Sequence, residues 1–102
     1  MSAMVRVELP AHLCRLAGVG HEVTVAVDAA PVTIATVLEV LERNYPALEG
    51  TIREHETKQR RAWLRFFVCE EDWSHVGMDA VLPPAIVNGK EPLLVIGAIA
   101  GG

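Results

Sequence analysis

T-I-A-T-V-L-E-V-L-E-R-N, residues 33–44, is the stretch that decides the fold. Its apolar residues recur at the i, i+3, i+4 and i+7 spacing of one helical face: Ile34, Val37, Leu38 and Leu41. Thr33 can cap the N-terminus of a helix through its hydroxyl, and Pro46 cannot continue one. The pattern therefore predicts a single amphipathic helix over residues 33–44.

The segments on both sides of this helix carry strand patterns. Residues 4–9 (M-V-R-V-E-L) and 22–27 (E-V-T-V-A-V) alternate apolar and polar residues, which is typical of half-buried strands. The glycines between them favour an antiparallel hairpin. Residues 62–69 are aromatic and β-branched and predict a third strand, and residues 93–96 predict the last one. The order predicts an α+β domain with one helix on a mixed sheet.

Two further segments carry weaker patterns. Residues 49–61 are polar and indicate an irregular connection, and the Pro83–Pro84 pair indicates a break in the chain. Residues 1–96 are expected to form one domain, followed by a C-terminal tail at 97–102.

Composition excludes several classes of protein. The chain has 102 residues, 51% of them hydrophobic, and a net charge of −4. These values indicate one compact domain and argue against a nucleic-acid partner, which usually requires a basic surface. No apolar run is long enough for a membrane span, and no secretory signal is visible. Cys14 and Cys69 form no CxxC pair, so we expect a cytoplasmic protein with reduced thiols.

Clusters of reactive residue types have simpler structural interpretations. The basic residues of segment 53–65 alternate with glutamates, which favours a solvated linker over a phosphate site. The acidic run 70–72 is interpreted as a solvated turn, although it could hold magnesium or meet a basic partner. The four histidines show no metal-binding spacing, and no nucleotide-binding or catalytic-triad motif occurs. We therefore expect no bound cofactor or metal and no side-chain catalysis.

The sequence resembles a known family, the β-grasp sulfur carriers of the MoaD/ThiS type. Four stretches carry the resemblance: V-R-V-E-L-P-A-H-L-C-R-L-A-G (5–18), the helix with its continuation to Leu48 (32–48), R-R-A-W-L-R-F-F-V-C-E-E-D-W (60–73), and I-V-N-G-K-E (86–91) together with the tail G-A-I-A-G-G (97–102). The tail is the most specific element. The family usually has Val-Asn-Gly or Val-Asn-Asp near the end of its third strand, where this chain has Val68-Cys69-Glu70.

The resemblance implies both a fold and a function. The implied fold is a ubiquitin-like β-grasp, with a mixed sheet of four to five strands packed on one main helix and a flexible Gly-Gly tail. The implied function is that of a sulfur carrier rather than an enzyme. An adenylating enzyme of the ubiquitin-activating type would use ATP to activate Gly102, a sulfur donor would convert it to a thiocarboxylate, and a synthase would accept the sulfur. Molybdopterin, thiamine and cysteine pathways all remain open.

This chemistry requires a narrow chain end. Glycine has no Cβ, so Gly101 and Gly102 could thread into a partner's buried nucleotide site. Six extended residues reach about 20 Å. Partner contacts are expected from the tail and from exposed third-strand residues: Ala98, Ile99, Ala100, Leu64 and Phe66, or the strand neighbours of the last two, depending on the pleat.

Two other functions remain as alternatives. A ubiquitin-like modifier would use the same adenylate but end as an isopeptide on a lysine. A non-reactive β-grasp interaction module would carry the glycines only as a frayed end.

Overall fold

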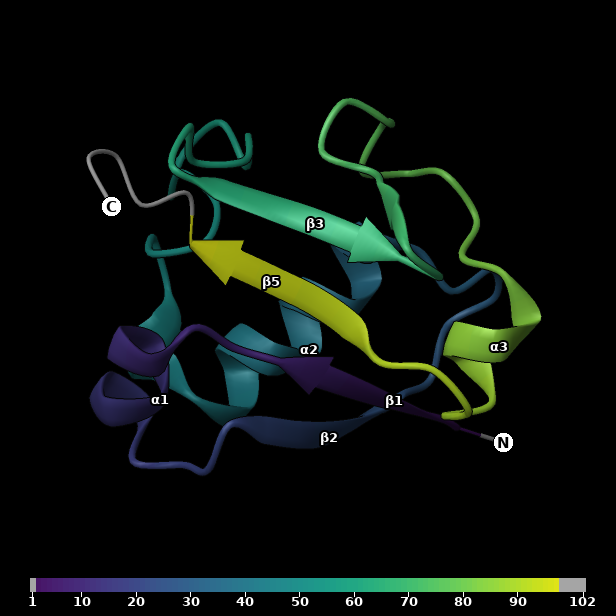
Figure 1. The fold of residues 1–102 in the computed structure, drawn as a ribbon, viewed down its shortest axis with the longest axis horizontal. Helices are drawn as coiled ribbons and strands as arrows, with labels where there is room; N and C mark the ends of the chain where they lie inside the picture. The colour runs from purple at the N-terminus through teal and green to yellow at the C-terminus, as the bar shows by residue number, and fades with distance from the viewer. Residues whose placement is uncertain (1, 98–102) are drawn as a thin grey trace.

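The computed structural model describes residues 2–97; Met1 and residues 98–102 lie outside the described part. Its centre is a five-stranded sheet of order β2-β1-β5-β3-β4 (Figure 1). The strands are β1 (Ala3–Glu8), β2 (Glu22–Val27), β3 (Leu64–Val68), β4 (Glu71–Asp72) and β5 (Leu93–Gly97). β1 and β5 run parallel, whereas the other neighbours are antiparallel. The predicted mixed sheet and the β1–β2 hairpin are confirmed.

The predicted main helix is α2 (Ile34–Asn44), which lies behind the sheet in Figure 1. Thr33 caps it in a reciprocal arrangement with Thr36: each side chain accepts a hydrogen bond from the other residue's backbone N–H, at 3.1 and 2.9 Å. The apolar stripe of the helix is fully buried. The helix ends at Asn44, before the 3-10 turn η1 (Pro46–Leu48) that begins with the proline.

The core lies between α2 and the inner face of the sheet. Alternate residues of each long strand point into it, including Val5, Val25, Phe66 and Val95, all nearly or fully buried. The outer face of the sheet has no helix across its centre, so residues such as Met4 and Ile96 remain exposed there. This difference between the two faces places the candidate site on the outer one.

The structure contains two short helices that the sequence interpretation missed. α1 (Ala11–Ala17) begins after Pro10 and ends at Gly18, whose φ of 71° closes the last turn in the left-handed conformation. α3 (Pro84–Val87) begins directly after Pro83. The two prolines that we interpreted as a break therefore start a helix, because a proline at the first position needs no N–H partner.

The segment between η1 and β3 is irregular, as predicted. Its arginines, however, contact the domain instead of belonging to a solvated linker. Arg53 is buried and forms an ion pair with Glu42 of α2 at 2.9 Å. Arg60 donates hydrogen bonds to the carbonyls of Ser74, Arg61 and Leu64. These arginines hold the irregular chain against the domain, because buried carbonyls need donors.

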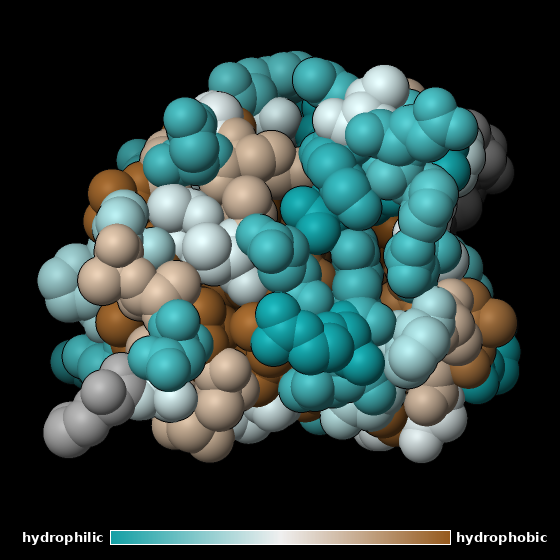
Figure 2. Space-filling model, turned by 180° about the vertical axis from the view of Figure 1, so that it is seen from behind, coloured by the Kyte–Doolittle hydropathy of each residue, from teal (hydrophilic) through white to brown (hydrophobic). Residues whose placement is uncertain are grey.

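The opposite side of the molecule, which carries α2, is largely covered by polar side chains with small apolar areas between them (Figure 2). Within residues 2–97, no helix has the length and apolar character needed to cross a bilayer.

Candidate functional site: the outer sheet face beside the end of β5

β5 brings the chain to the candidate site. It lies between β1 and β3, in the middle of the sheet, and its last residue, Gly97, pairs with Leu64. Gly97 is thus part of the sheet rather than of the tail to which we assigned it. The remaining predicted tail residues lie outside the described part: Ala98, Ile99, Ala100, Gly101 and Gly102. The structure fixes the point from which the tail departs.

The predicted contacts at Leu64 and Phe66 are wrong, because both side chains are buried in the core, with exposed fractions of 0% and 1%. The pleat of β3 has the opposite phase to the one these contacts required. Arg65 and Phe67 take the outer positions instead, opposite Ile96 and Leu94 of β5. Phe66 is therefore a core residue, whereas its neighbour Phe67 is partly exposed.

A groove of about 670 Å³ lies on the outer face at the end of β5. Two of the elements that line it, the end of β5 and α1, lie on the left side of Figure 1. Its exposed apolar side chains include Trp63 (54% exposed) and Ile96 (43% exposed). The lining comes from β1, α1, β5 and two connections: Glu8, Leu9, Pro10, Ala11, His12, Arg15, Trp63 and residues 94–97. Exposed aromatic and aliphatic residues beside a cavity are typical of a protein-docking surface.

Arginine side chains lie at and beside this groove. Arg15 of α1 lines it, and the guanidinium of Arg61 lies 5.8 Å from the centre of the Trp63 ring. Arg65 pairs with Asp72 at 3.2 Å, where hydrogen bonds from Ser74 and then the Arg65 charge lower the pKa of the Asp72 carboxyl. Glu8 is the one carboxylate among the lining residues. The groove therefore offers an apolar floor with one cation, Arg15, and one carboxylate, Glu8, among its lining residues.

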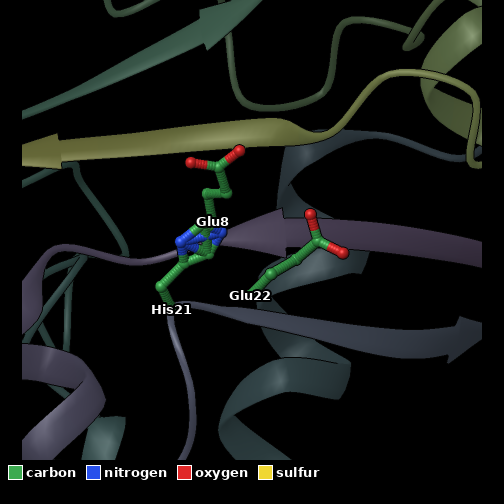
Figure 3. Close-up of side chains that lie close together, drawn as sticks. All are labelled: Glu8, His21 and Glu22. Carbon is green, nitrogen blue, oxygen red and sulfur yellow. The ribbon is translucent and has the colours of Figure 1, made fainter.

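The structure also brings together Glu8, His21 and Glu22 at the end of the β1–β2 hairpin, with ligand atoms within 4.8 Å of one another (Figure 3). Both carboxylate oxygens of Glu22 already accept hydrogen bonds from Arg6, at 2.9 and 3.0 Å. This interaction lowers the pKa of Glu22. We assign no metal to the cluster, because the guanidinium occupies the carboxylate that a metal would need.

Sequence reasoning missed the contribution of α1 to this site. Arg15 and His12 reach the groove only because residues 11–17 are helical and pack beside the end of β5. A signal was present: Pro10 and Gly18 flank seven residues, and proline before a helix with glycine after it is a boundary pattern. The helix is too short for its apolar spacing alone to reveal it.

No protein-family model and no curated protein matches the chain by sequence. Solved structures do match in three dimensions. The crystal structure of SAMP1 from Haloferax volcanii is 21% identical with a TM-score of 0.73, over 97% of this chain and 99% of that chain. The solution structure of small archaeal modifier protein 1 from Methanosarcina acetivorans is 21% identical with a TM-score of 0.72, over 100% and 99%.

A chain in the crystal structure of the Amycolatopsis orientalis BexX/CysO complex is 20% identical, with a TM-score of 0.71 over 96% of this chain and 99% of that chain. These likenesses span nearly the whole described domain. At this identity they establish architecture and leave function to be argued from the site. The chain therefore has the ubiquitin-like β-grasp fold that the sequence resemblance implied, in common with SAMP1 and CysO.

Proposed function

We propose that this chain is a sulfur carrier that acts through the carboxylate of Gly102. One observation carries the proposal: β5 leads the chain to a largely apolar groove and ends at Gly97, with A-I-A-G-G following in the sequence. A partner that docks on the groove would then have the last glycine within reach of its own active site.

The proposed chemistry belongs to the partners, and the carrier positions the reacting group. An adenylating enzyme of the ubiquitin-activating type would hold ATP and join Gly102 to AMP with release of pyrophosphate. A sulfur donor would then displace AMP and leave a thiocarboxylate at Gly102. That sulfur would serve a synthase of the molybdopterin, thiamine or cysteine type. The adenylating enzyme and the synthase would both bind this protein in the cytoplasm. Gly101 and the small residues before it would pass through the channel that leads to the partner's active site.

A second function, conjugation to other proteins, is favoured by the names of two structural neighbours, which are small archaeal modifier proteins. Both functions share the adenylate and separate afterwards. A carrier gains the mass of one sulfur-for-oxygen exchange at its C-terminus, whereas a modifier appears in covalent adducts with lysines of other proteins. Intact mass spectrometry of the protein from its native host distinguishes the two, and it also checks that the mature chain ends at Gly102.

Removal of Gly102 tests the proposal directly. We expect the shortened chain to lose ATP–pyrophosphate exchange with the adenylating enzyme of the same organism while it keeps its unfolding midpoint, because the deletion removes only the reacting group. A chain extended by two residues after Gly102 should fail in the same way. Exchange at the normal rate in either variant would contradict both reactive functions and favour the non-reactive interaction module.

Substitution of Ile96 tests the groove separately. Ile96→Arg places a charge on the apolar floor, so we expect KM for the carrier to rise at least tenfold in the exchange assay, since apolar contacts at the centre of an interface dominate its affinity. Met4→Arg is the matched control, because Met4 is also exposed (53%) on the outer face but lies at the far end of β1. Equal effects of the two variants would show that the groove has no special role.

A further inference from the structure

β2 forms an unprotected edge of the sheet. It is the first strand in the order β2-β1-β5-β3-β4, and β1 is its one strand partner among residues 2–97 (Figure 1). The opposite edge, β4, is two residues long and consists of two carboxylates, Glu71 and Asp72. β2 has six residues, E-V-T-V-A-V, with no lysine and no proline. Edge strands of natural proteins are usually short or carry lysine or proline, which prevent pairing with another chain. An edge without these features is a site where another strand can pair.

The backbone of β2 has free hydrogen-bonding groups on its outer side. Leu9 donates its N–H to the carbonyl of His21 at 3.0 Å. The register places Val23 and Val25 opposite Val7 and Val5. Hydrogen-bonded and non-hydrogen-bonded pairs alternate along an antiparallel ladder. Since Leu9 and His21 form a hydrogen-bonded pair, Val7–Val23 and Val5–Val25 are hydrogen-bonded pairs too. The backbone N–H and C=O groups of Glu22, Thr24 and Ala26 therefore point away from β1. Within residues 2–97, no backbone hydrogen bond from a loop or helix reaches these three residues.

A groove of about 180 Å³ lies beside this edge, between β2 and α2. Small and apolar residues form part of it, including Ala29 and Val40, and its charged residues are Asp28, Glu39 and Arg43. The edge therefore has one net negative charge at its C-terminal end. At the other end, Glu8 and Glu22 with Arg6 also sum to one negative charge. Both ends of the strand favour a cationic neighbour.

We propose that the edge of β2 binds an extended segment of another protein, apolar in its centre and carrying lysine or arginine at both ends. Main-chain hydrogen bonds to Glu22, Thr24 and Ala26 would supply the pairing, and the β2–α2 groove would take alternate side chains. A second copy of this chain fits less well. Antiparallel pairing centred on Val25 uses the whole strand but sets Glu22 against Asp28 twice, and like charges opposite each other destabilise a sheet. The proposal is independent of the chemistry at Gly102.

Peptide titration of the ¹⁵N-labelled protein tests the proposal. The probe is the capped peptide Lys-Ile-Thr-Ile-Thr-Lys, and its matched control is Glu-Ile-Thr-Ile-Thr-Glu. We expect saturable amide shifts at Glu22, Thr24 and Ala26 with the basic peptide and affinity about fivefold lower for the acidic one. Equal affinities, shifts at the β5 groove instead, or concentration-dependent pairing of β2 in the free protein would each overturn the proposal.

Two variants separate the edge from general effects on the fold. Thr24→Pro removes an outward N–H without removing a ladder hydrogen bond to β1, so binding should fall at least tenfold, whereas Thr24→Val should bind like the parent protein. Circular dichroism checks that both variants are folded. Asp28→Lys provides a second, independent measurement: it should weaken binding of the basic peptide and strengthen binding of the acidic peptide. If Asp28→Lys bound the basic peptide in preference to the acidic one by the same factor as the parent protein, the charge argument would be contradicted. None of the three substitutions alters Gly102, so the proposed carrier function is tested separately.

Discussion

At the scale of single residues, the turn between β3 and β4 contains two consecutive residues in a disfavoured backbone conformation. Cys69 and Glu70 have φ values of 49° and 70°, in the left-handed region that side chains other than glycine and asparagine disfavour. Two consecutive residues of this kind form the hairpin turn that Asn-Gly usually supplies. The difference from the Val-Asn-Gly pattern of the sulfur carriers is therefore located at a strained position.

Glu70→Gly should stabilise the protein by about 1 kcal/mol, because glycine adopts a positive φ without steric cost. Urea unfolding followed by tryptophan fluorescence measures the change. Glu71→Gly is the matched control: it removes the neighbouring carboxylate but lies in β4, where glycine weakens a strand. Stabilisation by both substitutions would point to relief of charge repulsion instead of backbone strain.

At the scale of elements, α2 is joined to the irregular segment after η1 by a buried ion pair. Arg53 donates two hydrogen bonds to the carboxylate of Glu42, at 2.9 and 3.0 Å, and both side chains are less than a tenth exposed. This pair is the buried ionic contact between the loop and α2. A buried pair of this kind stabilises chiefly because either partner alone would be an uncompensated charge.

Arg53→Leu should cost about 3–5 kcal/mol of unfolding free energy, since Glu42 would remain buried without its partner. The double variant Glu42→Leu with Arg53→Leu should recover most of that loss. Arg65→Leu, which breaks an exposed pair, should have a much smaller effect. Chemical denaturation of the four proteins completes the comparison. If the double variant were no more stable than Arg53→Leu, packing rather than charge would explain the loss.

The sequence predicted the long, strongly patterned elements and failed on the short ones. The α2 stripe and the alternation in β1 and β2 were sufficient because each repeats several times. α1 and α3 have seven and four residues, too few for periodicity, and they depend on contacts with the sheet. The inner face of β3 was misjudged although a signal was present: Leu64, Phe66 and Val68 form an all-apolar phase, whereas the other phase would place Arg65 in the core.

At the scale of the whole molecule, Arg6 connects segments far apart in the sequence. It pairs with Glu22 across the hairpin and donates to the carbonyls of Gly89 and Lys90, in the turn before β5. The side chain thus joins the N-terminal hairpin to the loop that leads into the last strand. The hydrogen bond from Arg6 lowers the pKa of Glu22 below its ordinary value of 4.5.

This pair predicts a pH dependence of stability. Because the pKa of Glu22 is lower in the folded protein, its contribution is present above about pH 4.5, the unfolded value. The contribution is lost as the pH falls through the folded pKa. Glu22→Gln should be less stable than the parent protein at pH 7, and the difference should shrink below pH 4.5. Urea midpoints between pH 3 and 7 measure this. Glu39→Gln, on an exposed face of α2, is the control. If its stability difference from the parent protein also decreased below pH 4.5, the assignment of the effect to Glu22 would be contradicted.

The central position of β5 has a consequence for biosynthesis. The strand inserts between β1 and β3, yet it is the last element of the described chain to leave the ribosome. Until residues 93–97 emerge, the two halves of the sheet have no strand to join them, and each presents an open ladder to other nascent chains. The sheet can then close only after β5 has been translated, so a product terminated before residue 93 would be a target for chaperones and proteases rather than a competitor for the partners of the intact protein.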